Sequence, residues 1–475
     1  MMRTTGWTGY AALVLAMGLT SIGLGSCDFP FSQVDRPVFD NPADPESRVP
    51  IEEVIALIEA ENDDPNPLVQ AILESGARYN TDIEELWLWY SDFPVSDLTG
   101  VVYLPRLRRF VLQDGMGVST VSLAGFLGHT GIEEIEVAGF APSVAQSIPP
   151  LPNLRRLDIS GTAGTGVDFS LMYEQTLQEL IARDANIDTL ADIERLGPIE
   201  HLDIRGGGNT YTDDDLMNEL IELADSLTVV QSLAPASIES FIASYPNLTG
   251  FGFEFTAGET LDETTLGLVA GYAQIEFVGF YGFSQISSLS PLANSGIVEL
   301  ELHQGGGGPG VDLSPLSDTP LRRVNLSEFA SVAGIASLPT SVEEIAFINV
   351  GMSSGNDELG SIAATLSNLR FLDISRNPEV VSLLPVSQNA VTMANLEEIR
   401  ADQDYLGVAP PDPYGIAEDA VTNGIADLAV LPNLRFLSIR NTRGAYEYSV
   451  SSIDIGLTAL WEAIPDLDVD ANFEF

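Results

Sequence analysis

The sequence contains no lysine, and its 20 basic residues are all arginine. Against them stand 69 acidic residues, which gives a formal net charge of −49. Sequence-independent binding to nucleic acid or to an anionic membrane surface needs basic patches that neutralise phosphate charges. A chain so poor in basic residues lacks such patches, and we therefore expect no nucleic-acid partner.

Cysteine is almost absent as well, since Cys27 is the only one in 475 residues. A single thiol excludes an intramolecular disulfide framework and a cysteine-rich zinc site. Hydrophobic residues make up 45% of the chain, which is too many for a wholly disordered protein. One compact core is also excluded, because single cores stop growing near ~250–300 residues. The chain therefore forms several domains or one elongated repeat.

Residues 1–26 have the pattern of a secretory signal peptide, with Arg3 as a basic start and an apolar stretch behind it. The stretch ends in Leu24-Gly-Ser-Cys27, which resembles the lipobox of bacterial lipoproteins. In that motif the cysteine is acylated and becomes the mature N-terminus. We expect Cys27 to be lipidated and to anchor the protein in a bacterial cell envelope, on the periplasmic side or at the cell surface. An uncleaved membrane anchor and ordinary secretion are the alternatives. Residues 27–50, rich in proline and aspartate, are predicted to form a tether.

A short unit of the form apolar-x-x-apolar-x-apolar recurs along the rest of the chain. Its first copies begin at Ile83, Leu107, Ile132 and Leu154. Counting a weaker copy at Leu227, fifteen units start 21 to 38 residues apart. One such turn cannot bury its own apolar side, whereas a stack of turns buries a continuous core. The repeat therefore predicts a solenoid.

The repeat resembles the leucine-rich repeat family, and its short units after a helical lead-in are most similar to bacterial internalin-type proteins. The resemblance covers residues 83–475, about 15 repeats, and implies an α/β solenoid with a curved parallel sheet inside and loops and short helices outside. Residues 51–82 have helical spacing and resemble the N-terminal cap of such chains. Asn377 occupies the asparagine position of the family. Other residues stand at the equivalent places in further repeats, namely Thr162, Ala185, Gly207 and Thr442.

Charges alternate in sign at the second position of many units. In a parallel sheet of consecutive repeats, equivalent residues become neighbours about 4.8 Å apart. Opposite charges across neighbouring strands contribute roughly 0.2–1 kcal/mol each, and like charges repel. We therefore predict a structural charge ladder on the inner face, formed by Glu84, Arg108, Glu133, Arg155, Arg322, Glu343, Arg370, Glu397 and Arg435.

Aromatic residues also occupy positions that point away from the predicted core. Exposed aromatic side chains on a concave wall are typical of binding surfaces. The plainer interpretation is that the N-terminal cap covers the two tryptophans and that the other rings stack along the sheet. The candidate binding residues are Trp87, Trp89, Tyr90, Phe277, Tyr281, Phe371 and Phe436.

Signals for catalysis are weak. The segment from Gly351 to Gly355 matches Gly-x-Ser-x-Gly, but it falls in a loop after a strand unit rather than in a strand-turn-helix. The glycine run 305–308 lacks the Lys-Ser/Thr of a phosphate loop. The three histidines, His129, His201 and His303, lie far apart in the repeat register, and His201 continues the charged row after Glu179. We expect no enzyme, no metal and no cofactor.

The sequence thus favours a non-catalytic envelope lipoprotein that presents a leucine-rich repeat arc for the recognition of a protein or glycan. A structural scaffold without a specific ligand is the alternative, and an enzyme of unidentified type comes third. With no lysine and a net charge of −49, the composition resembles that of proteins from salt-loving organisms. An acid-rich, high-GC lineage would explain the same composition.

Overall fold

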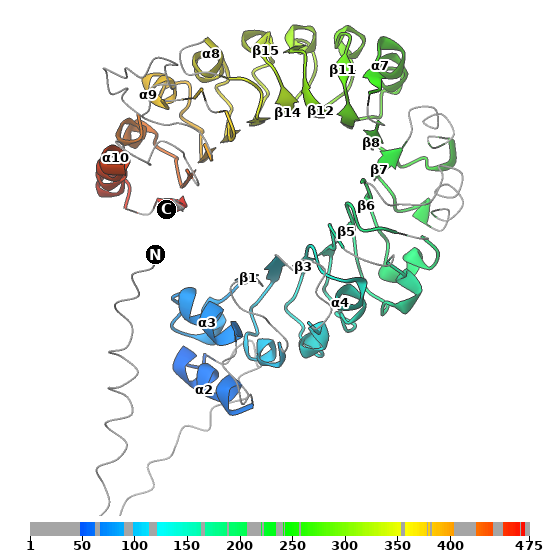
Figure 1. Ribbon diagram of the computed structural model, residues 1–475, viewed down its shortest axis with the longest axis vertical. Coiled ribbons are helices and arrows are strands. Elements are labelled where there is room, and N and C mark those ends of the chain that lie inside the picture. The colour runs from blue at the N-terminus through cyan, green and yellow to red at the C-terminus, as the bar shows by residue number, and fades with distance from the viewer. Residues whose placement is uncertain are drawn as a thin grey trace, which may run out of the picture.

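The computed structural model is an arc whose inner side is one parallel sheet of 16 strands (Figure 1). The strands pair in chain order, each with the strand of the repeat before and after it, which confirms the predicted α/β solenoid. The predicted signal peptide, Cys27 and most of the tether lie outside the described residues. The structure describes residues 48–61, 67–89, 98–113, 121–162, 167–187, 190–206, 220, 223–233, 241, 243–255, 258–352, 357–377, 379–380, 382–402, 424–439, 450–465 and 467–470.

The long sheet consists of β1 (Glu85–Trp89), β2 (Arg109–Gln113), β3 (Glu134–Val137), β4 (Arg156–Asp158), β5 (Glu179–Ile181), β6 (His201–Asp203), β7 (Val229–Leu233), β8 (Gly250–Glu254), β10 (Phe277–Phe283), β12 (Glu299–Gly308), β14 (Arg323–Phe329), β16 (Glu344–Ile348), β17 (Phe371–Asp373), β18 (Glu398–Arg400), β19 (Phe436–Ser438) and β20 (Asp468–Asp470). Two small sheets accompany it, formed by β9 (Thr260–Leu261) with β11 (Gln285–Ile286) and by β13 (Val311–Asp312) with β15 (Val332–Ala333).

Short helices return the chain on the outer side of the arc (Figure 1). The α-helices are α2 (Ile51–Glu61), α3 (Pro67–Glu74), α4 (Pro142–Gln146), α7 (Glu263–Ala270), α8 (Asp357–Thr365), α9 (Leu384–Gln388) and α10 (Val450–Ala463). Single turns of 3-10 helix serve other repeats: η1 (Asn80–Asp82), η2 (Thr99–Tyr103), η3 (Leu123–Phe126), η4 (Phe169–Leu171), η5 (Ile193–Leu196), η8 (Ser290–Leu292), η9 (Ser314–Leu316), η10 (Ile335–Ser337) and η11 (Ala426–Val430).

The hydrophobic core lies between the sheet and this outer layer. Successive side chains of a strand point to opposite faces of the sheet. Every second residue of a unit therefore points away from the concave face and into the core. In β3, Ile135 and Val137 are buried, whereas Glu134 and Glu136 are partly exposed on the concave face. The buried residues form one cluster that continues from Val49 to Leu467. The solenoid therefore has a single continuous core, as stacking of incomplete repeats requires.

Helices α2 and α3 cover the first repeat, where the predicted N-terminal cap was placed. Ile58 and Leu68 are fully buried against the core. The folded part begins slightly earlier than expected, because Val49 is buried and its N–H donates to Asn80 Oδ1 over 2.9 Å. At the other end of the arc, α10 and β20 close the sheet (Figure 1).

The strand register brings the predicted charge rows together. The N–H of Arg108 donates to the Glu84 carbonyl and that of Glu133 to the Arg108 carbonyl, each over 2.8 Å. The same backbone pattern joins Arg155 to Glu133, and it recurs along the row Arg322, Glu343, Arg370, Glu397 and Arg435. Three ion pairs of this ladder are Arg108–Glu133 at 2.8 Å, Arg322–Glu343 at 3.6 Å and Arg370–Glu397 at 3.0 Å. These pairs are exposed, so each contributes little on its own.

A left-handed residue turns the chain out of the sheet in many repeats. It lies five positions after the first residue of the strand, where its φ is positive. Glycine adopts this conformation without steric cost, and asparagine or aspartate tolerate it. The residues at this corner are Gly139, Gly161, Asp184, Gly206, Gly282, Glu328, Asn349 and Arg376. The positive φ is thus a property of the repeat rather than of a single site.

Asparagines in front of the strand units tie neighbouring repeats together. In each case the side-chain Nδ2 donates to a backbone carbonyl of the preceding repeat, over 2.7 to 2.9 Å. The five asparagines are Asn153, Asn247, Asn368, Asn395 and Asn433. The recurring Asn-Leu of the sequence therefore has a structural cause.

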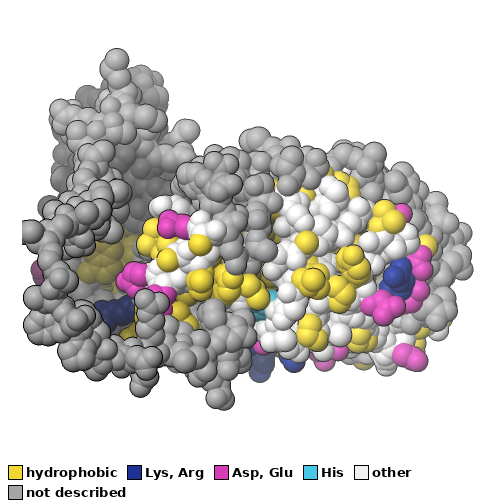
Figure 2. Space-filling model, turned by 90° about the horizontal axis from the view of Figure 1, so that it is seen from below, with side chains coloured by type: hydrophobic (Ala, Val, Ile, Leu, Met, Phe, Trp, Pro, Cys, Tyr) yellow, Lys and Arg dark blue, Asp and Glu magenta, His cyan; other side chains and the backbone are white. Residues whose placement is uncertain are grey.

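Among the side chains that Figure 2 colours by type, the basic ones do not form a region of their own. Arginine atoms there lie beside acidic atoms, and the hydrophobic side chains form small separate groups (Figure 2). Among the described residues, the helices are too short or too polar to cross a membrane.

Candidate functional site

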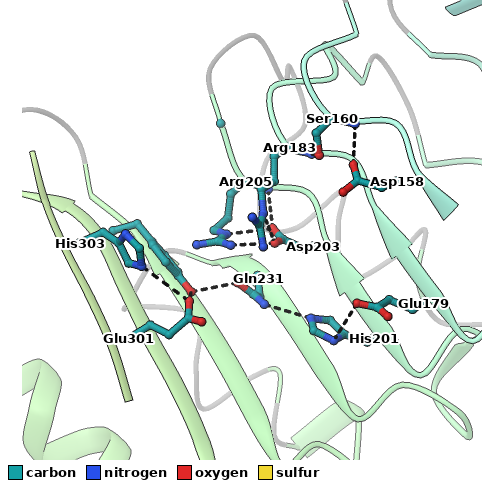
Figure 3. Close-up of polar contacts among 12 residues, drawn as sticks. Asp158, Ser160, Glu179, Arg183, His201, Asp203, Arg205, Gln231, Glu301 and His303 are labelled. Atoms are coloured by element: carbon teal, nitrogen blue, oxygen red, sulfur yellow. Dashed lines mark hydrogen bonds and ion pairs between the residues drawn. The ribbon is translucent and has the colours of Figure 1, made fainter. Parts of the chain in front are cut away.

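Polar side chains gather in the middle of the concave face, at the third residue of each strand. The two strands that flank this region have apolar residues at this position, Ile181 of β5 and Ala346 of β16, and strands further out have polar residues again, such as Asp158 of β4 and Asp373 of β17. In the middle of the arc the register runs through polar residues and glycines instead: Asp203, Gln231, Gly252, Gly279, Glu301 and Asn325. The polar residues of this row and their partners are called the central network below (Figure 3).

Asp203 is the most buried charge of the central network, with a fully buried side chain. Its Oδ1 accepts from Arg205 Nε over 2.8 Å and its Oδ2 from Arg205 Nη2 over 2.7 Å, a bidentate pair. Arg183 Nε donates to Oδ2 as well (Figure 3). Burial alone would raise the pKa of Asp203, but the hydrogen bonds and charges of the two arginines outweigh it and hold the pKa below its usual value.

Glycines make the centre of this face flat. A Cβ on Gly279 would lie 2.2 Å from the Tyr281 hydroxyl oxygen, and a Cβ on Gly252 would lie 2.7 Å from Gln231 Cβ. Any other residue at these two positions would therefore displace its neighbour. The two glycines allow Tyr281 and Gln231 to lie along the sheet.

Tyr281 corrects one prediction, because it was expected to be an exposed binding residue and is only 8% exposed. The Arg205 guanidinium carbon lies 3.6 Å from the centre of its ring and covers it. The hydroxyl hydrogen-bonds to the Glu301 carboxylate and lies 3.0 Å from Gln231 Oε1. Burial, together with the nearby negative charge of Glu301, raises the pKa of Tyr281 well above 10. The tyrosine therefore belongs to the central network.

Two of the three histidines border the central network from opposite sides (Figure 3). His201 Nε2 lies 3.0 Å from Gln231 Nε2, and its Nδ1 lies 3.7 Å from Glu179 Oε1, so it continues the charged row as predicted. His303 Nδ1 lies 2.8 Å from Ser327 Oγ. Burial lowers the pKa of both imidazoles. The central network is thus bordered by an imidazole ring on each of two sides.

His129 lies outside the central network. Its Nε2 donates to the Leu104 carbonyl over 2.9 Å, and its Nδ1 accepts from the N–H groups of Gly131 and Ile132. This imidazole braces a buried loop between two repeats. Within the part of the chain that the structure describes, no three histidine, cysteine or acidic side chains are placed to hold a metal ion.

A hollow of about 400 Å³ opens over the central network. Arg183, Arg205, Tyr281, Glu301 and His303 line it, and Glu254 and Asp184 stand at its wall. Glu254 is held in place because its Oε2 accepts from the Gly206 N–H over 3.0 Å. The hollow combines guanidinium donors with carboxylate acceptors, which suits a polar or charged ligand.

No protein-family model and no curated protein matches the chain. Similar solved structures include a leucine-rich repeat protein of Leptospira interrogans, with 14% identity, 82% of this chain and 90% of that chain covered, and a TM-score of 0.33. The functional domain of InlJ from Listeria monocytogenes has 12% identity, 83% and 82% coverage, and a TM-score of 0.29. TLR13 in a complex with single-stranded RNA has 14% identity, 82% and 55% coverage, and a TM-score of 0.36.

With TM-scores this low, the architecture is decided by the protein's own strand order and repeat. The fold is a leucine-rich repeat solenoid. Asn377 behaves as the repeat asparagine of this solenoid, since its Oδ1 accepts from Val350 N–H and its Nδ2 donates to the Phe347 carbonyl.

The other candidate binding residues of the solenoid do not form one patch. Trp87 is 43% exposed on β1, with the Arg109 guanidinium 4.9 Å from its ring. The side chain of Trp89 and all of Tyr90 lie outside the described residues. Phe277 is partly buried at the first position of β10. Each of these residues keeps its binding role as a prediction.

Phe371 and Phe436 do come together. They flank Glu398 in the register of β17, β18 and β19. Arg400 lies between their rings, with its guanidinium carbon 5.4 Å from Phe371 and 5.7 Å from Phe436. The side chain of Arg400 therefore already contacts one face of each of the two rings.

The central network was missed by the sequence analysis, except for Tyr281 and His201. Its signal in the sequence is a pair of glycines set between polar residues at one strand position. Asp203, Gln231 and Glu301 stand at the third strand position of their units, and Gly252 and Gly279 stand between them. Polar residues also occupy this column in other units, such as Asp158 and Asp373, so in the sequence the two successive glycines mark the place.

Proposed function

We propose that the protein is a non-catalytic lipoprotein, anchored in the cell envelope through Cys27, whose leucine-rich repeat arc recognises a protein or glycan through the central network. The supporting observation is the fully buried carboxylate of Asp203, which pairs with Arg183 and Arg205. Buried ion pairs stabilise a fold no better than apolar residues of similar size. Because the neighbouring strands β5 and β16 have the apolar residues Ile181 and Ala346 in the same column, the sheet does not need an ionic group there, which favours a role in recognition. A net charge of −49 suits a saline habitat, where salt screens the repulsion.

A serine–histidine pair in the central network does not favour hydrolysis. Ser327 contacts His303 Nδ1, but Glu301 Oε2 lies 3.8 Å from His303 Nε2, beyond hydrogen-bond distance. Ser327 pairs in register with His303 on one side and Ile348 on the other, so its backbone belongs to the sheet. Acyl transfer needs N–H donors directed at a developing oxyanion, and a central strand has none to offer. The positive φ of Glu328 behind it is the corner of the repeat.

The anchor is tested by replacing the cysteine that would carry it. We expect Cys27→Ser to move the protein from the membrane fraction to the soluble fraction, because two or more acyl chains are needed for stable anchoring. Fractionation with mass spectrometry of the N-terminal peptide measures this. A mature peptide that begins upstream of residue 27, or a serine variant that stays in the membrane, would contradict the lipid anchor.

Recognition is tested by capture from envelope extracts with residues 28–475, which contain the whole described core. We expect a partner to be retained by the wild type and lost from Arg183→Glu, because charge reversal at the rim of the hollow opposes the same ligand. Glu136→Gln, at the third position of β3 and away from the hollow, is the matched control and should retain the partner. Equal capture by both variants would remove the hollow from the proposal. No partner at all would favour the scaffold.

A further inference from the structure

The hollow over the central network is lined by groups of both charges, and this mixture restricts its ligand; the inference rests on the function proposed above. Two guanidinium groups share the single carboxylate of Asp203. The carboxylates of Glu254 and Glu301 also line the hollow. An occupant that offers both an acceptor and a cation satisfies both kinds of group.

The two arginines differ in what they can still bind. Arg205 donates from both Nε and Nη2 to Asp203, lies flat on the Tyr281 ring and is only 11% exposed. Arg183 donates to Asp203 through Nε, and its side chain is 49% exposed. The terminal N–H groups of Arg183 are thus the donors of the hollow that a ligand can reach. A carbonyl or carboxylate oxygen fits them.

Carboxylate groups outnumber guanidinium groups around the hollow. Around the hollow, the two arginines face the carboxylates of Asp184, Asp203, Glu254 and Glu301, which gives a formal charge of −2. Clefts lined by one sign of charge concentrate ligands of the other sign. Among the described residues, Glu254 accepts from the Gly206 N–H through Oε2 alone, and the Tyr281 hydroxyl contacts Oε2 of Glu301. Both carboxylates therefore have a second oxygen for a cation.

The aromatic ring of the hollow offers no open face to a sugar. Arg205 covers one face of Tyr281 at 3.6 Å, and the other lies against Gly279, where a Cβ would come within 2.2 Å of the hydroxyl. A volume of about 400 Å³ is near the small end of ligand sites, enough for a long side chain with its main chain. These features favour a charged side chain over a pyranose.

We infer that the hollow binds a basic side chain projecting from a protein partner, with its cationic head between Glu254 and Glu301 and a main-chain carbonyl of the same segment accepting from Arg183. The bidentate match of a guanidinium with a carboxylate makes arginine the better guest. Specificity for a protein would then come from one inserted residue, as in many interfaces where a few anchors carry most of the binding energy.

The experiment titrates the capped peptide acetyl-Gly-Arg-Gly-amide into residues 28–475 and follows saturation transfer to the peptide protons by NMR. We expect binding with a Kd of about 1 mM, as a single anchor gives. Glu254→Gln and Glu301→Gln should each weaken it about tenfold, the size of one charge-assisted hydrogen bond. Glu136→Gln should leave it unchanged. The citrulline peptide, which has the same shape without the charge, should also bind about tenfold more weakly.

Equal binding of the arginine and citrulline peptides, or no saturation transfer to either, would overturn the inference. Saturation transfer to hexoses that disappears in Glu301→Gln would replace it with a glycan. If Arg183→Glu abolishes capture while the arginine peptide does not bind, recognition by the hollow stands and only its chemistry is wrong. Should Glu301→Gln fail to fold, the exposed carboxylate of Glu254 still provides the test.

Discussion

Replacing Asp203 by asparagine is expected to lower the free energy of unfolding by about 3–5 kcal/mol, the cost of leaving buried charges without their partner. The variant keeps the shape of the side chain but removes the charge that Arg183 and Arg205 share. Most of this loss comes from Arg205, because its guanidinium is almost buried against Tyr281 and water cannot replace the carboxylate there. Urea unfolding at pH 7 measures the difference from the wild type.

The pH dependence gives this prediction a second measurement. The pKa of Asp203 is below its unfolded value of 3.8, so its ionised form stabilises the folded state above that pH. As the pH falls through the folded pKa, the carboxylate is protonated and the stabilisation is lost. The gap between wild type and Asp203→Asn should therefore be full at pH 7 and shrink progressively below about pH 4.

A ladder residue provides the control for Asp203. Glu133 also bonds an arginine over 2.8 Å, but this pair with Arg108 is exposed on the concave face. Glu133→Gln should leave the stability nearly unchanged, because water replaces the lost partner of an exposed pair. If Asp203→Asn and Glu133→Gln lowered the free energy of unfolding equally, burial of Asp203 would have no energetic consequence. The case for recognition by the central network would then lose its support.

The repeat pattern predicted the fold because it is a local signal repeated many times. Each unit places residues by the alternation of a strand, and stacking brings like positions together. The alternating charges Glu84, Arg108 and Glu133 could be ordered in the sequence before any contact was known, and their backbones do pair in that order. The helical cap at residues 51–82 was expected from the resemblance, and a stack of repeats needs such a cover at its end.

The central network could not be predicted in the same way, because it depends on contacts between different columns of different repeats. Tyr281 starts in the fifth position of β10, yet its hydroxyl reaches Gln231 in the third column of β7. It does so because Gly279 leaves room and because Arg205, which follows β6 three strands away in the sheet, covers the ring. A repeat pattern predicts which equivalent positions lie side by side, whereas the contacts of the central network join different positions of different repeats.

The second large effect is expected at Asn377, the asparagine that the family pattern singled out. It is fully buried, and its Oδ1 accepts from the N–H groups of Val350 over 2.9 Å and Met352 over 3.3 Å. Its Nδ2 donates to the carbonyls of Phe347 over 2.7 Å and Ile374 over 2.6 Å. Asn377→Ala leaves these backbone groups unsatisfied in the core, at about 1–3 kcal/mol for each buried group that finds no water. We expect a total loss of about 2–4 kcal/mol in urea unfolding.

Two substitutions separate the bracing role of Asn377 from the general loss of an amide. Asn368→Ala removes an exposed amide whose Nδ2 donates to the Thr340 carbonyl over 2.8 Å, and it should cost about 1 kcal/mol or less. Asn377→Thr should fall in between, because Thr162 at the equivalent corner satisfies the Ile159 carbonyl with its hydroxyl but cannot hold the N–H groups of the next loop. If the amide of Asn377 braces both turns, the free energy of unfolding should increase in the order Asn377→Ala, Asn377→Thr, wild type. A threonine variant no more stable than alanine would assign the loss to the volume of the side chain.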